Sequence, residues 1–372
     1  MDTNGVNADR VEHSPGAMLS RMEIELNGAA AAGTETWPQI RDAARQVPGG
    51  ALDAILLTGC GDSYYAGLGL RGLLEAAAGV PVLVQPAMEA VTFPSALITP
   101  RALVVGISVS GKVERTIQAV AQHRGRSGPT VSISAYADSD LGLAADAAIA
   151  TGIRGTPGPV PGTANYVGSM LGLLAIALEL GERRDAAPFS DADVLTALDA
   201  LDATVAVGGG LAKAEASVLE PPFFSIGSGP DLGSSWFGVA KFIEAAATVG
   251  VAQDLEEWAH EQFFTTVPGT TVFVHATSAA VHQRARRVAG SVVKVGGRLV
   301  SVASDPLGIA GEHHWPLAAV DERLAPLVAW VPGAMTALAY ARHAGRHPFG
   351  IDLPGRMRTV DEDIYLAQPN RV

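Results

Sequence analysis

The chain has 372 residues, which at roughly 100–200 residues per domain predicts two domains. Its formal net charge of −12 argues against a nucleic-acid or membrane partner. The single cysteine, Cys60, excludes a disulfide within the chain and a zinc site of the CxxC type. Because the N-terminus is polar and lacks the apolar stretch of a signal peptide, we expect a cytoplasmic protein.

Apolar runs and helical stretches alternate along the chain. Residues 1–16 are expected to be a tail, and the helical spacing of apolar residues predicts a short lead-in helix over 18–27. Strands are predicted at 54–57, 82–84, 103–107, 130–133, 147–150, 223–226, 271–274 and 299–302. One helix is predicted from the residue after Ser63 to Ala78, and a second from the residue after Lys112 to His123. Further helices are predicted at 165–180, 184–215 (with a break at 208–210), 236–247, 280–288 and 333–344. This alternation is typical of βαβ units and predicts an α/β fold with mainly parallel sheets flanked by helices.

A weak internal repeat indicates duplication of one fold. Gly59-x-Gly61 recurs as Gly227-x-Gly229, an offset of 168 residues. A match between 75–78 and 244–247, at an offset of 169, carries less weight because alanine runs are common in this composition. We expect four segments: a tail and lead-in helix at 1–35, a first domain at 36–195, a second at 210–345, and a closing tail at 346–372.

Two glycine-containing loops follow predicted strands. In Gly59-Cys-Gly61-Asp-Ser63, backbone N–H groups at a helix start and the Ser63 hydroxyl favour an anion. Ser108-Val-Ser110-Gly-Lys112 can direct further hydroxyls and amides at the same anion. Each loop alone is also compatible with a plain turn or helix cap. Because ligands of open α/β sheets bind at the carboxyl ends of strands, the two loops together predict one phosphate site.

A third constellation combines a lysine, a glutamate and a histidine. Lys241 and Glu244 are three residues apart and share a helix face, and His260 follows sixteen residues after Glu244. A carboxylate base and an imidazole are suited to proton transfer, although a surface salt bridge and a loop histidine are the plainer reading. Glu257-x-x-His260 also has the form of half a two-metal site, but it occurs once, so no metal is expected.

The loops GCGDSYYAG and SVSGKVERT resemble the paired loops GxGxSxxA and SxSGxTxxT of the SIS (sugar isomerase) family. The segments MLSRMEIEL, AGVPVLVQPAMEA and PGTANYVGSM are similar to the sugar-isomerase half of glutamine–fructose-6-phosphate amidotransferase, so the resemblance covers about residues 18–365. It implies two tandem SIS domains. It also implies a set of residues that hold or lie near the sugar phosphate: Gly61, Ser63, Ser108, Ser110, Lys112 and Thr163.

The resemblance also implies roles for the third constellation. Glu244 would move a proton between C1 and C2 of the sugar, and Lys241 would stabilise the developing enolate. His260 would open the sugar ring, in that family from the neighbouring subunit, so a homodimer is expected. Glu257 would lie beside His260, and Arg358 in the closing tail would bind an anion.

Three departures from the family pattern bear on the reaction. Val113 stands where the family usually has threonine, which removes a hydroxyl donor, and Glu261-Gln262 replaces Gly-Pro after His260. No lysine follows Lys294, whereas the amidotransferase tail supplies one that forms a Schiff base. The guanidinium of Arg358 cannot form an imine, which argues against the synthase reaction by that route.

We therefore expect an isomerase or an aminosugar-phosphate deaminase or deglycase acting at C1–C2 of a hexose 6-phosphate. No glutaminase domain and no cofactor are expected. A non-catalytic phosphosugar sensor and an ammonia-dependent synthase-type aminotransferase remain the alternatives.

Overall fold

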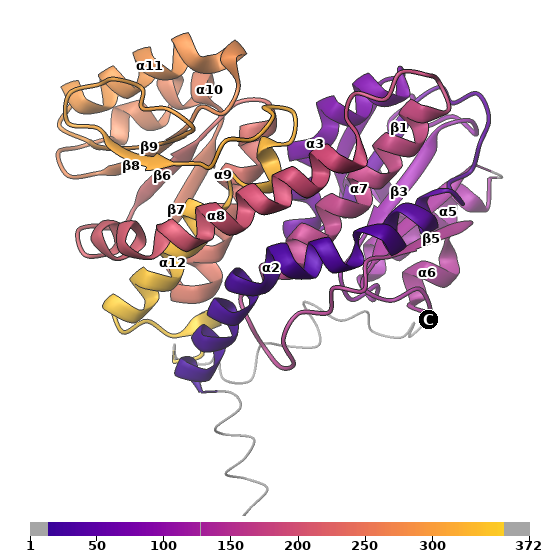
Figure 1. The fold of residues 1–372 in the computed structure, drawn as a ribbon, viewed down its shortest axis with the longest axis horizontal. Helices are drawn as coiled ribbons and strands as arrows, with labels where there is room; N and C mark the ends of the chain where they lie inside the picture. Colours follow the sequence, from indigo (N-terminus) through magenta and orange to yellow (C-terminus); the bar gives the residue numbers. More distant parts are fainter. Residues whose placement is uncertain (1–13, 127, 353–372) are drawn as a thin grey trace, which may run out of the picture. The chain divides into compact units, whose positions relative to one another are not determined.

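The computed structural model describes residues 14–352 except residue 127, and these residues form two compact units (Figure 1). The N-terminal unit consists of Ala31–Arg154 and Ala164–Leu195. Of the described residues, the C-terminal unit contains those from 14 to 30, Gly155–Thr163, and those from 196 to 352. Helices α2 (Pro15–Ala44) and α8 (Asp191–Ala216) contribute residues to both units.

The N-terminal unit contains a five-stranded sheet in the order β2-β1-β3-β4-β5, in which all neighbours are parallel. Its strands are β1 (Ile55–Gly59), β2 (Val82–Pro86), β3 (Leu103–Ile107), β4 (Thr130–Ser134) and β5 (Ala147–Ala150). Its helices are α3 (Asp62–Ala78), α4 (Ala87–Thr92), α5 (Glu114–Arg124), α6 (Asp140–Ala144) and α7 (Ala164–Glu182). Leu56 and Val104 pack with residues of α4, α5 and α6, whereas Leu57 faces α3. Since successive side chains point to opposite faces of a strand, the sheet is covered on both sides.

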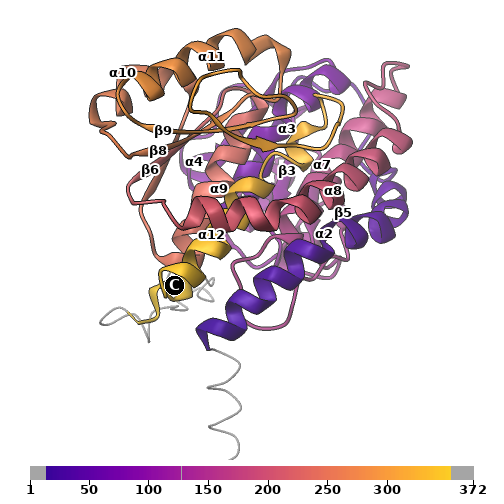
Figure 2. The same ribbon diagram turned by 60° about the vertical axis from the view of Figure 1, so that its left-hand side comes forward.

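The C-terminal unit repeats this architecture with the order β10-β9-β8-β6-β7, again all parallel (Figure 2). Its strands are β6 (Phe223–Ile226), β7 (Gly250–Gln253), β8 (Thr271–His275), β9 (Arg298–Ala303) and β10 (His313–Pro316). Its helices are α9 (Pro230–Ala246), α10 (Leu255–His260), α11 (Ala279–Lys294) and α12 (Val331–His343), with short 3-10 helices at Gln262–Thr265, Ala325–Leu327 and Pro348–Gly350. Helices α10 and α11 cover one face, while α9 packs on α12, where Gly238 and Gly333 allow close approach.

The two units are copies of one fold in a constant register. Helix α3 spans Asp62–Ala78 and α9 spans Pro230–Ala246, so both ends differ by 168 residues. The same offset separates Ile55 from Phe223 at the starts of β1 and β6. The expected α/β fold, with mainly parallel sheets flanked by helices in two domains, and the offset of the glycine pair are thus confirmed.

Several helices differ from their predicted extents: α9 begins at 230 rather than 236, α11 ends at 294 rather than 288, and α2 and α8 also differ. The lead-in helix was expected over 18–27, but α2 continues to Ala44 because buried Trp37 and Ile40 extend its apolar face past Pro38. The predicted break at 208–210 was wrong, since α8 runs through it. A Cβ atom on Gly208 would lie 2.5 Å from the sulfur of Met335, so this glycine serves close packing.

Two strands were not predicted, and both are edge strands. β7 has the sequence GVAQ and β10 has HHWP, and neither contains an apolar run. They form because β6 and β9 offer them a parallel partner. Short, polar edge strands are a common way to terminate a sheet, and they carry little sequence signal.

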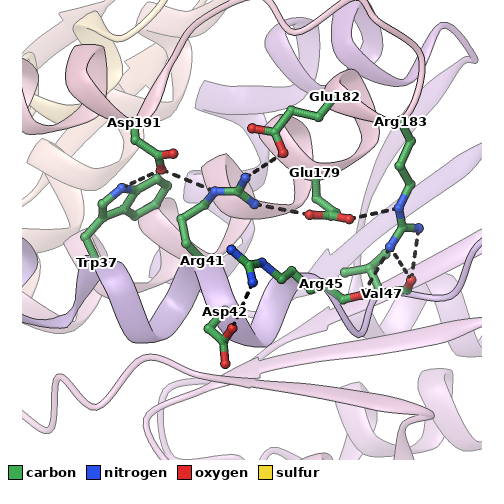
Figure 3. A network of polar contacts seen from close by, with 9 residues as sticks. All are labelled: Trp37, Arg41, Asp42, Arg45, Val47, Glu179, Glu182, Arg183 and Asp191. Carbon is green, nitrogen blue, oxygen red and sulfur yellow. Dashed lines mark hydrogen bonds and ion pairs between the residues drawn. The ribbon is translucent and has the colours of Figure 1, made fainter.

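A polar network ties α2, α7 and α8 together in the N-terminal unit (Figure 3). Arg41 forms ion pairs with Glu179, Glu182 and Asp191 at 3.3, 2.7 and 3.2 Å. Only 12% of the Arg41 side chain is exposed, so these pairs are screened by solvent less than ordinary surface pairs. Trp37 adds a hydrogen bond to Asp191 at 2.9 Å. The network fixes α2 against the start of α8.

Helices α7 and α8 are each long and apolar enough, by length and composition, to cross a membrane. The apolar window of α7 is 89% buried and that of α8 is 44% buried. α7 packs on α3 within the N-terminal unit. This is the position of a core helix, so its apolar character is explained by the fold.

Candidate functional site

One candidate site lies where β1 and β3 end side by side in the N-terminal unit. Gly59 and Ile107 are paired in parallel register, so the loops that follow both strands begin at one edge of the sheet. A Cβ atom on Gly59 would lie 2.8 Å from the carbonyl oxygen of Ile107. Glycine is therefore required for this approach. We call loops 59–63 and 108–113 together the first cradle.

Loop 59–63 turns directly into α3. Gly61 caps this helix with φ 54° and ψ −127°, a conformation that favours glycine. Ser63 lies in the first turn and is only 5% exposed. The N–H groups and the dipole of this 17-residue helix favour an anion here, with the Ser63 hydroxyl as an additional donor.

Loop 108–113 presents a buried hydroxyl to the same edge. Ser108 is 2% exposed, and its hydroxyl has no hydrogen-bond partner in the part of the chain that the structure describes. Leaving such a group unsatisfied costs about 1–3 kcal/mol, which a ligand oxygen would recover. Gly111, at φ 66°, donates its N–H to the Ser108 carbonyl at 3.0 Å. The Ser110 side chain accepts the N–H of Lys112 at 3.2 Å, and both residues are exposed.

Val113 has a definite place in this loop. It is the N-cap residue of α5, in extended conformation, and it makes no side-chain capping bond. A threonine at this position would supply a hydroxyl to the helix start or to a ligand. Lys112 is exposed to solvent, and its printed contact is through its backbone N–H rather than its side chain.

A separate candidate site is a buried ion pair on α9 in the C-terminal unit. Lys241 is fully buried, and its Nζ lies 2.6 Å from Oε2 of Glu244 and 3.0 Å from the carbonyl oxygen of Gly162. The ammonium also lies over the Phe237 ring, 4.7 Å from its centroid. The Glu244 side chain is 27% exposed. The arrangement therefore places a fully desolvated cation behind a carboxylate that solvent and ligands can still reach.

Glu25, which the sequence analysis did not single out, holds the loop that contacts Lys241. It is 3% exposed, and its carboxylate accepts the N–H groups of Thr156 and Thr163 at 2.8 and 2.9 Å and the Thr156 hydroxyl at 3.0 Å. The carbonyl between these anchors, that of Gly162, is the one that receives Lys241. Thr163 is fully buried, and its hydroxyl has no partner among the described residues.

A sequence signal for Glu25 existed. The apolar spacing that predicts the lead-in helix places Met18, Met22 and Leu26 on one buried face, and Glu25 falls on the same face. A charged residue on a buried helix face is rare unless it is paired or hydrogen-bonded.

His260 and Glu257 lie apart from the ion pair. The His260 side chain is 70% exposed, and its Nε2 lies 3.7 Å from Oε1 of Glu256. Within the described residues no hydrogen bond or ion pair joins His260 to Lys241 or Glu244. Glu257 is exposed, and its N–H is capped by Asp254. The fold therefore brings Lys241 and Glu244 together but leaves His260 and Glu257 facing solvent.

Arg358 lies outside the described residues, as does the closing part of the tail that was expected to cover the site.

The family model of the SIS domain matches residues 53–177, which contain the first cradle and all of β1–β5. The similarity to the SIS family thus covers the N-terminal sheet and the two loops of the first cradle. Over 134 residues, 36% of its length, the chain is 31% identical to glutamine–fructose-6-phosphate aminotransferase [isomerizing] of Tropheryma whipplei (strain Twist), and the match covers 21% of that protein. It is 40% identical over 73 residues to the enzyme of the same name from Bordetella parapertussis, covering 12% of it. The chain thus spans about a fifth or less of the curated relatives it matches.

Solved structures extend the likeness in fold beyond residues 53–177. The C-terminal domain of glucosamine-fructose-6-phosphate aminotransferase from Francisella tularensis has a TM-score of 0.75 at 16% identity, covering 88% of this chain and 97% of that one. Tagatose-6-phosphate ketose/aldose isomerase from Escherichia coli has a TM-score of 0.74 at 17% identity, covering 91% and 97%. Glucosamine-6-phosphate deaminase from Thermotoga maritima has a TM-score of 0.73 at 17% identity, covering 90% and 98%. At these identities the matches establish the fold, here over both units.

Proposed function

We propose that this protein is a sugar-phosphate isomerase or an aminosugar-phosphate deaminase or deglycase that acts at C1–C2 of a hexose 6-phosphate. The observation that carries the proposal is the Lys241–Glu244 pair, in which a desolvated ammonium adjoins a solvent-accessible carboxylate. Moving a proton between C1 and C2 requires a base at carbon and a positive charge near the enolate that develops. Glu244 is the base, and Lys241 supplies the charge.

The first cradle supplies the second requirement, a site for the phosphate. The start of α3, the Ser63 hydroxyl and the unsatisfied Ser108 hydroxyl are donors suited to a phosphate group. The names of similar proteins, an aminotransferase that isomerises fructose 6-phosphate, a deaminase and a ketose/aldose isomerase, support the same class of substrate. In this proposal His260 opens the ring from the neighbouring subunit of a homodimer, which agrees with its exposure.

The test is proton NMR in D₂O with glucosamine 6-phosphate and with fructose 6-phosphate, each with and without ammonia. Deuterium entering at C1 or C2 supports proton transfer, and release or uptake of ammonia separates deaminase or synthase from isomerase. Glu244→Gln should abolish exchange, whereas Glu220→Gln, at an exposed carboxylate of the C-terminal unit, should not. Binding of either sugar without exchange would favour the non-catalytic sensor.

Glu244→Gln removes the carboxylate that lies 2.6 Å from the buried Lys241 ammonium, so the variant could lose activity by unfolding. The double variant Lys241→Met/Glu244→Gln removes both charges and keeps the volume. If it is folded and binds sugar phosphate but does not exchange deuterium, the loss is chemical. If it still exchanges, the assignment of the base is wrong.

A further inference from the structure

We propose that the C-terminal unit contains a second anion cradle, equivalent to the first, which the carboxylate of Asp231 fills from within. The chain would then bind one phosphate rather than two, and removing this carboxylate would open a second anion site. The comparison with the first cradle rests on the proposed phosphate site there.

The loop before α9 has the same backbone as the loop before α3, whereas α11 begins at Ala279, three residues earlier in the repeat than α5 at Glu114. Gly229 caps α9 with φ 61° and ψ −126°, and Gly61 caps α3 with φ 54° and ψ −127°. A Cβ atom on Gly227 would lie 2.7 Å from the Cβ of Asp231, as one on Gly59 would lie 2.8 Å from that of Ser63. Asp231 therefore starts from the position that Ser63 has in the first cradle, 168 residues earlier.

The donors of the second cradle point at the Asp231 carboxylate. Thr277 is the second residue after β8, and Val109, 168 residues earlier in the chain, is the second residue after β3. The N–H of Thr277 donates to Oδ2 of Asp231 at 3.0 Å, and its hydroxyl donates to Oδ1 at 2.6 Å. Asp231 is 1% exposed and lies in the first turn of the 17-residue α9, where the helix dipole favours an anion. A carboxylate thus receives the hydrogen bonds that an external anion would receive.

The filled cradle affects how α9 is held. Asp231 joins the start of α9 to the loop after β8, and the same helix carries Lys241 and Glu244 further along. In the first cradle the corresponding link between α3 and the loop after β3 would form only when phosphate is bound. The helix that carries Lys241 and Glu244 is therefore held in place without a ligand, whereas the two loops of the first cradle become linked only when phosphate binds.

The experiment uses crystals of the full chain soaked in tungstate, a phosphate-like anion located by its anomalous scattering. Asp231→Ser should bind tungstate at both cradles. The wild type and the matched control Asp231→Asn should bind it only at the first, because the amide keeps the volume and still accepts from Thr277. Tungstate at only the first cradle of Asp231→Ser would overturn the inference and leave the proposed function standing. Tungstate at only the second would support the inference and remove the phosphate site from the proposed function. Tungstate at neither cradle of Asp231→Ser, or at the second cradle of the wild type, would overturn the inference.

If Asp231→Ser does not crystallise, its melting is followed in inorganic phosphate and in chloride of equal ionic strength. A ligand that binds only the folded state raises the melting temperature. Phosphate should raise the melting temperature of Asp231→Ser by more than it raises that of Asp231→Asn. Equal shifts in the two variants would show that no second site has opened.

Discussion

The backbone N–H of Thr163 donates to Oε2 of Glu25 at 2.9 Å, which joins positions 138 residues apart in the chain. This bond and those from Thr156 hold the loop whose Gly162 carbonyl accepts Lys241. Glu25 is linked to Lys241 through this loop. Its place in the proposed mechanism is to position the loop that orients Lys241.

Replacing Glu25 by Gln should loosen this loop. An amide has one acceptor oxygen where the carboxylate has two, so a buried N–H at Thr156 or Thr163 loses its partner, at about 1–3 kcal/mol. We expect that loss in urea unfolding, together with a fall in kcat and little change in KM. Glu25→Asp should recover part of kcat. Glu23→Gln, on the exposed face of the same helix, is the control, and an equal effect there would contradict this role.

The Lys241–Glu244 pair should show strong coupling in a double-mutant cycle. Removing one partner of a buried pair leaves a charge uncompensated and typically costs 3–5 kcal/mol. Because Lys241 is fully buried and Glu244 is 27% exposed, Glu244→Gln should destabilise much more than Lys241→Met. The double variant should regain most of the stability of the wild type. Urea unfolding of the four proteins measures the coupling, and additive losses would mean that the two charges do not depend on each other.

Val113→Thr should restore a hydroxyl at the start of α5. Val113 is the N-cap residue and makes no capping bond, and a threonine cap is worth about 1 kcal/mol. We expect higher stability and tighter binding of sugar phosphate, measured by unfolding and by calorimetry. Val113→Ala lacks the hydroxyl and should give neither gain. Weaker binding by the threonine variant would indicate that the valine methyl groups contact the ligand.

The sequence predicted the parts of this fold that depend on local pattern. The central strands, the two glycine turns and the register of the repeat follow from apolar runs and from glycine at positions of positive φ. The edge strands β7 and β10 were not predicted, because their pairing depends on neighbours distant in sequence. The role of Glu25 could not be predicted for the same reason, since the hydrogen bonds that it accepts from Thr156 and Thr163 link positions more than 130 residues apart. The Lys241–Glu244 contact was accessible because its two residues lie one helical turn apart.

Two buried groups in the C-terminal unit should give opposite pH dependences. Burial raises the pKa of Asp231 to about 6, above its ordinary 3.8. The folded state then binds more protons than the unfolded state between these values, so this group's contribution to stability falls as pH rises from about 4 to 6. Burial lowers the pKa of His275 to about 3, below its ordinary 6.5. Its contribution is present above about 6.5 and is lost as pH falls towards 3.

Between pH 4 and 6 the two groups change the stability of the wild type in opposite directions. A variant that removes one of the groups shows the effect of the other. Asp231→Asn should lose stability more steeply than the wild type on acidification below pH 6. His275→Leu should instead gain stability as pH falls from 6 to 4. Urea unfolding at half-unit pH intervals tests both expectations. Parallel curves for all three proteins would show that neither group titrates in this range.

His260 should act in the active site of the neighbouring subunit. The side chain is 70% exposed and makes no polar contact with the Lys241–Glu244 pair in the described structure, which is expected if it serves another chain. His260→Ala and Ser63→Ala should each abolish deuterium exchange, because each site of either homodimer lacks one group. After unfolding and refolding together at equal amounts, half of the random dimers are mixed, and each mixed dimer contains one intact site. The mixture should therefore recover about a quarter of the wild-type rate. If His260 serves its own chain, every site in the mixed dimers lacks one of the two groups, and the mixture stays as inactive as its components.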